Sequence, residues 1–174
     1  LTCDVGSKIV TGSTIPSPLV MSAQGVCWRH EGDRLAPLER GWAFTMRETV
    51  CLGTDRDVRG LLDRGALHAE NLARDLGLEA ELCVASDPFF APTSRGRAAL
   101  QRIKGLKHEL VVRFPDGGAL AIASFNDHER FFGEAFDIML EGGGHASSGC
   151  VAYGIERWLL AVLAAFTLAS AGAT

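Results

Sequence analysis

The sequence predicts an α+β fold, in which antiparallel strands form a sheet and helices flank it. The predicted elements run as strand, loop, strand, helix, several further strands and a final helix, without regular alternation of single strands and helices. In addition, two β-prone runs at 106–114 and 119–126 are joined by Pro115-Asp116-Gly117-Gly118. That tetrapeptide is a strong turn signal between antiparallel strands.

The first predicted hairpin pairs strands at 25–31 and 42–52 across a loop that is rich in Gly, Pro and mixed charges. In the second strand, the period-two alternation of side chains places Phe44, Met46 and Glu48 on one face with Trp42. The residues before this hairpin are rich in Gly, Ser, Thr and Pro, so they predict mostly irregular structure.

A long amphipathic helix follows the hairpin. Thr54 is a suitable N-cap, acidic residues occupy the first turn, and Val58, Leu61 and Leu62 begin an apolar stripe. Gly77 suits the position just after the helix. The remaining predicted elements are a strand at 79–85, a short helix at 95–102, a strand at 132–140 and a final helix at 155–168.

Size and composition predict a single globular domain over residues 1–174. The chain is 47% hydrophobic, which supplies a core, and its net charge of -4 argues against a large nucleic-acid surface. The apolar run at 158–171 is shorter than the ~20 residues that a membrane span needs, so no membrane association is expected. Five cysteines, an odd number, favour reduced thiols and a cytoplasmic location. Because the chain begins at Leu1 in a polar segment, we expect an N-terminally incomplete fragment.

Two charged clusters stand out. Arg29 and Glu31 are two residues apart on a predicted strand and share a face, although an isolated pair of this kind is more often a surface ion pair. The second cluster, Gly154-Ile155-Glu156-Arg157, opens the final helix. An Arg at a helix N-terminus is electrostatically unfavourable, which suggests that Arg157 has another task.

Taken together, these clusters resemble motifs 2 and 3 of the class II aminoacyl-tRNA synthetases. The resemblance implies an antiparallel sheet flanked by helices. It also implies that Arg29, Glu31 and Arg157 are catalytic and that they bind ATP together with Phe44. In that family the motif 2 Arg holds the α-phosphate and the amino-acid carboxylate, and the Glu contacts the adenine amino group or the incoming amine. The Phe stacks on adenine, and the motif 3 Arg clamps the far phosphates with its planar fork of donors.

Six further runs resemble the amino acid:[carrier protein] ligases more closely, a group related to the zinc-dependent seryl-tRNA synthetases of methanogenic archaea. These runs are Phe44–Glu48, Asp87–Phe90, Lys107–Glu109, Ser124–Asn126, Phe132–Phe136 and Gly149–Arg157. The resemblance implies that a small amino acid is activated with ATP as an aminoacyl adenylate. The aminoacyl group would then pass to the phosphopantetheine thiol of a carrier protein.

The same resemblance implies a catalytic zinc held by Cys3, Glu48 and Cys150, with Cys27 as the alternative first ligand. Three protein ligands and one open position are typical of catalytic zinc. The open position would take the unprotonated α-amine of the substrate.

Magnesium is expected to accompany ATP, and Asn126 lies where the family places polar residues near the substrate or the bound magnesium. Glu134 and Asp137 are alternative acidic contacts. Ala121 and Ala123 replace the acidic magnesium ligand that many class II enzymes carry, so the magnesium-holding side chain stays open. For His108 and His128, a place in the site and a structural role are equally open.

Two other functions compete with the carrier-protein ligase. A zinc-dependent seryl-tRNA synthetase would need a separate tRNA-binding domain, and none is visible, so no tRNA partner is expected. A non-catalytic synthetase-like binding module is disfavoured because Arg29, Glu31 and Arg157 are retained. Motif 1, which builds the dimer interface in class II enzymes, is absent from these residues, so we expect a homodimer formed through the missing N-terminal part.

Overall fold

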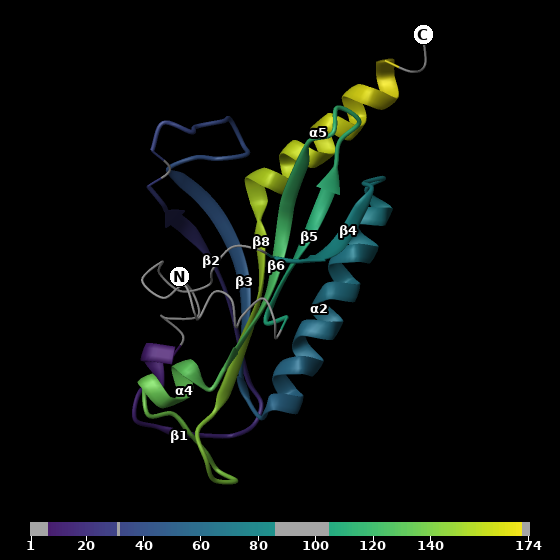
Figure 1. Ribbon diagram of the computed structural model, residues 1–174. Coiled ribbons are helices and arrows are strands. Elements are labelled where there is room, and N and C mark those ends of the chain that lie inside the picture. The colour runs from purple at the N-terminus through teal and green to yellow at the C-terminus, as the bar shows by residue number, and fades with distance from the viewer. Residues whose placement is uncertain (1–6, 31, 86–104, 172–174) are drawn as a thin grey trace.

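The computed structural model describes residues 7–30, 32–85 and 105–171, with side chains up to residue 167. Its centre is a six-stranded antiparallel sheet with the strand order β2-β3-β8-β6-β5-β4 (Figure 1). The strands are β2 (Leu19–Trp28), β3 (Ala43–Gly53), β4 (Ala80–Val84), β5 (Lys107–Arg113), β6 (Ala119–Glu129) and β8 (Ser147–Gly154). A small parallel pair, β1 (Thr14–Ile15) with β7 (Met139–Leu140), lies apart from this sheet. The predicted fold class is therefore confirmed.

Two helices cover one face of the sheet. Helix α2 (Asp55–Asp75) and helix α5 (Ile155–Ala171) pack on the sheet, as Figure 1 shows. Both contribute to one hydrophobic core, which includes Ala69, Ala73, Leu110, Ile122, Phe125, Val151, Trp158 and Ala161. Among the described residues, no helix is long and apolar enough to cross a membrane.

The ends of α2 form as predicted. The Thr54 side chain accepts a hydrogen bond from the Asp57 backbone, and the Asp57 carboxylate accepts one from the Thr54 backbone, so the two residues form a capping box. At the other end, Gly77 has a φ of +71°, a conformation that glycine adopts without strain. The charged and capping residues of the sequence therefore fix both ends of this helix.

Two glycines let α2 approach β8 closely. A Cβ atom at Gly65 would lie 2.5 Å from Val151 Cγ2, and one at Gly149 would lie 2.6 Å from Val58 Cγ1. Neither distance is possible without a shift of the helix or the strand. The sheet is therefore held against α2 at the strand that also carries Cys150.

Three sequence-based expectations differ from the structure. Strand β2 begins at Leu19 rather than at residue 25, because residues 19–28 pair one to one with 52–43 in spite of their Ser and Gly content. The strand predicted at 132–140 is wrong, since α4 (Phe131–Ala135) forms there and only β7 is extended. The predicted strand 25–31 extends only to Trp28, so Arg29 lies after the strand rather than on it.

Close packing against a distant residue and backbone hydrogen bonds account for the α4 turn. Gly133 packs so tightly that a Cβ atom would lie 2.0 Å from the Ala146 carbonyl oxygen. Glu134 and Phe136 donate backbone hydrogen bonds to Arg130 and Phe132, which closes the turn. The short helix predicted at 95–102 lies outside the described residues.

Candidate active site

A cavity of about 920 Å³ opens on the face of the sheet opposite the two helices. Strands β3, β5, β6 and β8 form its floor, and the connection between β2 and β3 and the first turn of α5 form one end. Six predicted site residues line it: Arg29, Phe44, Glu48, Asn126, Cys150 and Arg157. Residues that are far apart in the sequence therefore face one shared space.

One end of the cavity gathers guanidinium groups. Burial lowers the pKa of Arg157, and the positive charges of Arg29 and Arg40 lower it further, so the three groups lie within electrostatic reach of one another. Arg157 Nε donates to the Glu39 carbonyl oxygen at 2.9 Å, and its Nη1 donates to the Ala121 carbonyl oxygen at 3.0 Å. A cluster of like charges, in which backbone carbonyls hold Arg157 in place, is suited to bind a polyanion.

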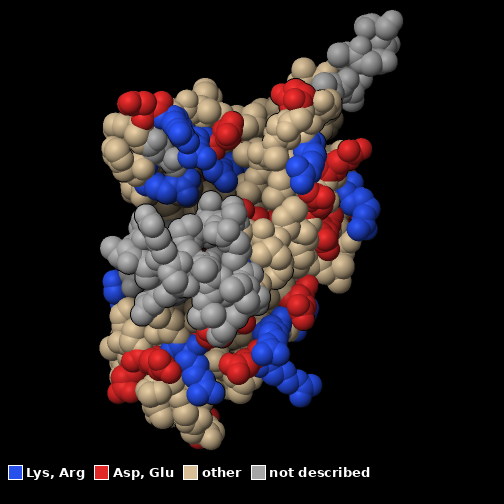
Figure 2. All heavy atoms as spheres, viewed as in Figure 1, with Lys and Arg blue, Asp and Glu red and all other residues tan. Residues whose placement is uncertain are grey.

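Phe44 lies at this end as well. The Arg29 Cζ atom lies 5.3 Å from the centre of the Phe44 ring, which is a cation–π distance. In Figure 2, Lys and Arg side chains gather over the β2–β3 connection, which carries Arg29, Arg34 and Arg40. Sequence reasoning missed Arg40, because a single Arg in a charged loop has no periodic pattern that would distinguish it.

Glu156 fixes the start of α5 beside this cluster. The β3–β8 ladder ends at the pair Met46 and Gly154, so the next backbone N–H on β3, that of Thr45, has no strand partner on this side. Both Glu156 carboxylate oxygens accept from that N–H, each at 2.8 Å. Burial alone would raise the pKa of Glu156, but hydrogen bonds from the backbone N–H groups of Glu156 and Thr45 outweigh it and hold the pKa below its ordinary value. The contact sets where Arg157, the next residue, enters the cavity.

The other end of the cavity holds Glu48 and Cys150, each only 3% exposed. Glu48 pairs with Ala152 on β8, and Cys150 lies two residues away on that strand. The two side chains therefore share a face as diagonal neighbours, whose Cα atoms lie roughly 7–8 Å apart in antiparallel sheets. That separation allows a carboxylate oxygen and a thiolate sulfur to converge on one metal ion.

Cys27 does not join this pair. It lies on the same face but pairs with Phe44, four residues from Glu48, which is about 13 Å along a strand. Partial burial and the negative charge of Glu48 raise the pKa of Cys27. Cys3 and Glu31 lie outside the described residues. Within the described part of the chain, no group of three or more His, Cys, Asp or Glu side chains is placed to hold a metal ion.

Asn126 lies beside Cys150 rather than at the guanidinium end. Its Nδ2 donates to the Cys150 sulfur at 3.3 Å and to Ser124 Oγ at 3.2 Å. Its Oδ1 is buried without a hydrogen-bond partner among the described residues. The alternative acidic contacts, Glu134 and Asp137, do not line the cavity: Glu134 is exposed on α4, and Asp137 pairs with His145 at 3.4 Å.

Lys107 and Glu109 bring an ion pair to the floor of the cavity, with 2.9 Å between Nζ and Oε1. In the sheet, Lys107 lies opposite Asn126 and Glu109 lies opposite Ser124. The negative charge of Glu109 also acts on Arg157 and tends to raise its pKa. This effect is smaller than the lowering of that pKa by burial and by Arg29 and Arg40. Glu109 is thus an acidic group between the two ends of the cavity.

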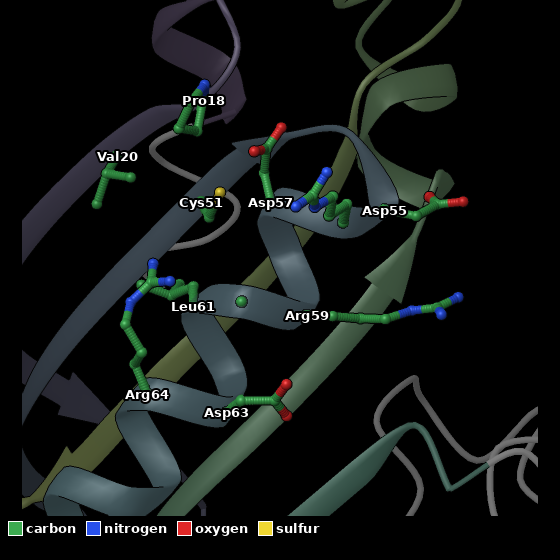
Figure 3. Close-up of a pocket in the computed structure, with 11 residues that line it drawn as sticks. Pro18, Val20, Cys51, Asp55, Asp57, Arg59, Leu61, Asp63 and Arg64 are labelled. Carbon is green, nitrogen blue, oxygen red and sulfur yellow. The ribbon is translucent and has the colours of Figure 1, made fainter.

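A second hollow, of about 590 Å³, lies between β2, β3 and the first turns of α2 (Figure 3). Cys51 lines it from β3, and because side chains alternate along a strand it points to the face opposite Glu48. Burial, with the nearby charge of Asp57, raises the pKa of Cys51 to about 11, so the thiol stays protonated at neutral pH. The acidic and basic side chains around it belong to neighbouring positions of α2, and this hollow lacks the convergence of the first cavity.

Comparisons with known proteins agree with this geometry. No family model matches the chain. Over 137 residues the chain is 38% identical to amino acid--[acyl-carrier-protein] ligase 1 of Bradyrhizobium diazoefficiens. This match covers 78% of the chain and 41% of the relative. The chain is also 31% identical over 147 residues to the type-2 serine--tRNA ligase of Methanococcus maripaludis. That match covers 82% of the chain and 29% of the relative. The chain is homologous to these ligases.

Solved structures give the same fold. The M. kandleri SerRS in complex with A. aeolicus tRNASec superimposes with a TM-score of 0.81 at 21% identity, covering 93% of the chain and 33% of that protein. Giardia lamblia prolyl-tRNA synthetase in complex with prolyl-adenylate gives 0.74 at 18% identity, covering 92% and 32%. The chain thus has the class II synthetase catalytic fold and spans about two fifths of the length of its carrier-protein ligase homologues.

Proposed function

We propose that this chain is the catalytic part of an ATP-dependent ligase that activates a small amino acid and transfers it to the phosphopantetheine thiol of a carrier protein. The homology to amino acid--[acyl-carrier-protein] ligases supports this reaction. The observation that carries the proposal is the convergence of three guanidinium groups and the Glu48–Cys150 pair on one cavity.

In the first step, the amino-acid carboxylate attacks the α-phosphorus of ATP, which gives an aminoacyl adenylate and pyrophosphate. Arg29 would hold the α-phosphate and the attacking carboxylate, and Arg157 and Arg40 the outer phosphates. Phe44, beside Arg29, would stack on adenine, and Glu31 would contact the adenine amino group. Prepositioned donors of this kind stabilise the charge that develops in the transition state. In the second step, the carrier-protein thiol takes the aminoacyl group and releases AMP.

A zinc ion fits the other end of the cavity. Glu48 and Cys150 are buried donors of the right chemistry on adjacent strands, and Cys3 would be the third ligand. When bound, such an ion would select substrates that carry a free α-amine. The buried Asn126 Oδ1 atom supports this placement, because an acceptor without a partner beside Cys150 is suited to receive an N–H of that amine.

Magnesium would accompany ATP. Glu109 lines the cavity between the metal end and Arg157, and it offers a carboxylate on this face where Ala121 and Ala123 offer none. Carboxylate oxygens are preferred magnesium ligands. When bound, the ion would neutralise part of the phosphate charge.

Transfer to tRNA is the second candidate, favoured by the 31% identity to a type-2 serine--tRNA ligase. We place carrier-protein transfer first because the identity to the carrier-protein ligases is higher and the net charge of -4 does not favour a polyanionic partner. The four cysteines that the structure describes are free of disulfides, which is consistent with the proposed cytoplasmic location.

We also propose that the protein acts as a homodimer. Strand β2 forms an edge of the sheet in the described part of the chain, and its Val20, Val26 and Trp28 are at least half exposed. Exposed apolar side chains on a strand edge favour association. Sedimentation velocity at several concentrations would reveal it, and a monomer throughout would contradict it.

Amino-acid-dependent exchange of labelled pyrophosphate into ATP tests the first step. We expect exchange with a small amino acid such as glycine or alanine, and loss of exchange after zinc chelation that readdition of zinc restores. A second pair of assays then separates the two transfer reactions. One measures transfer of the aminoacyl group to a phosphopantetheinylated carrier protein, and the other measures aminoacylation of tRNA. Absence of exchange with every amino acid, at full zinc occupancy, would contradict the proposed function.

A further inference from the structure

Two buried polar side chains contact the Cys150 sulfur, and a third contacts one of them. We name the four residues the Cys150 cluster: Asn126, His128, Ser148 and Cys150. All four are at most 5% exposed. The Cys150 sulfur lies 3.3 Å from Asn126 Nδ2 and 3.8 Å from His128 Nε2. The other ring nitrogen, His128 Nδ1, lies 3.2 Å from Ser148 Oγ.

The fold builds this cluster from two adjacent strands. Asn126 and His128 are two residues apart on β6, as Ser148 and Cys150 are on β8, so each pair shares a face. Asn126 pairs directly with Cys150, and an irregularity between Asp127 and Glu129 then shifts the register so that Glu129 lies opposite Ser148. Glu129 has a φ of +50°, which marks the local distortion. The Phe132 ring stands edge-on to the imidazole at 5.0 Å and restrains it.

The hydrogen-bond donors and acceptors in the cluster follow from the Cys150 sulfur being a thiolate when a metal is bound. A metal-bound cysteine is a thiolate, which only accepts hydrogen bonds. The His128 Nε2 atom must then carry a hydrogen, and in a neutral imidazole Nδ1 becomes an acceptor for the Ser148 hydroxyl. The Asn126 amide likewise presents its NH₂ group to the sulfur. Every donor in the cluster therefore has an acceptor.

We propose that His128, with Asn126, is a positioning residue that donates an N–H hydrogen bond to the Cys150 thiolate and so strengthens metal binding at Glu48 and Cys150. This inference rests on the zinc ion of the proposed function. The physical need is clear, because a thiolate and a carboxylate are buried side by side, and burying charge is costly unless hydrogen bonds and a cation compensate it. Groups that orient metal ligands in this way commonly set metal affinity.

The competing interpretation makes His128 a zinc ligand itself, in place of Cys3. The geometry disfavours it, since Nε2 is directed at the sulfur and Nδ1 at Ser148. A ring nitrogen that donates a hydrogen bond to a ligand sulfur is not available to the metal. The two interpretations predict different behaviour for a glutamine at this position, because its amide can donate to sulfur but is a poor zinc ligand.

The test is zinc affinity, measured by competition with a chromophoric chelator for the wild-type chain, His128→Leu and His128→Gln. We expect zinc binding to weaken about 10–100-fold in His128→Leu and to recover largely in His128→Gln. His68→Leu, an exposed histidine replaced on α2, is the matched control and should bind zinc as the wild type does.

Cobalt substitution gives a second readout that general loss of structure would not mimic. Removing an N–H donor raises the energy of the sulfur lone pairs, so the thiolate-to-cobalt charge-transfer band should move to lower energy in His128→Leu and return in His128→Gln. Unchanged affinity and an unchanged band in His128→Leu would overturn this inference alone. Equal, complete loss of metal in both variants would overturn it in favour of direct ligation. A wild-type chain that binds neither metal would overturn it together with the zinc site, whereas exchange activity would still report on the ATP site.

Discussion

At the scale of single residues, the position of a side chain along a strand decides which chemistry it joins. Glu48 points into the large cavity, while Cys51, three residues later on β3, points to the opposite face beside α2. Cys150 pairs with Val50 and therefore points to the Glu48 side. Five cysteines are thus not equivalent, and of the four that the structure describes only Cys150 combines deep burial with a place in the cavity.

Glu156 leads to a prediction about pH at this scale. Its folded pKa lies below the ordinary value of 4.5, so its contribution to stability is complete above that pH and is lost as the pH falls through the folded pKa. We expect Glu156→Gln to be less stable than the wild type at pH 7, and the difference to narrow as the pH falls below about 4.5. Urea unfolding at a series of pH values measures this, and a constant difference across the series would contradict it.

How far the sequence predicts single residues depends on whether a motif marks them. Arg29, Phe44 and Arg157 were predicted by resemblance to two motifs, and the structure brings all three to one cavity. Arg40 joins them only because the β2–β3 connection folds back through the bridge between Ala36 and Arg40. His128 joins Cys150 only through the pairing of β6 and β8. Contacts of this kind arise from tertiary structure, which local patterns do not encode.

At the scale of elements, the packing of α2 against β8 leads to a prediction with an internal control. Gly65→Ala would press a methyl group against Val151, and overpacking of this kind costs about 1–3 kcal/mol of unfolding free energy. Gly60→Ala, in the same helix, meets only the flexible end of Arg64, so the better helix propensity of Ala should stabilise the chain by about 0.5–1 kcal/mol. Chemical denaturation measures whether the unfolding free energy falls in Gly65→Ala and rises in Gly60→Ala. Equal changes of unfolding free energy in the two variants would contradict the close approach of α2 to β8 at Gly65.

Elements were predictable where local signals and tertiary demands agree. Helix α2 has a cap, a charged first turn and a terminal glycine, and its observed ends match the predicted ones. The segment 131–136 shows the opposite case, since its three phenylalanines suggest a strand, but they form a packed ring group around α4 instead. There the fit of Gly133 against Ala146 outweighs the β propensity of the aromatic residues.

At the scale of the whole molecule, the candidate metal site joins two adjacent strands in the interior of the sheet. Strand β3 carries Glu48 and strand β8 carries Cys150, and α2 and α5 both pack on this part of the sheet from behind. An ion that binds only the folded chain stabilises it in proportion to the logarithm of its concentration. Metal binding should therefore be visible in thermal unfolding as well as in activity.

This linkage gives the last prediction. At a free zinc concentration 100 times the dissociation constant, the unfolding free energy of the wild-type chain should rise by about 2.7 kcal/mol. For a chain of this size, that corresponds to a rise of about 5–11 °C in Tm. Cys150→Ser should abolish the rise. Cys51→Ser should lower the Tm without zinc, because it places a hydroxyl in the core, but should keep the rise, because that side chain faces away from Glu48. Differential scanning calorimetry with and without zinc separates these outcomes, and a rise that survives in Cys150→Ser would place the metal elsewhere in the molecule.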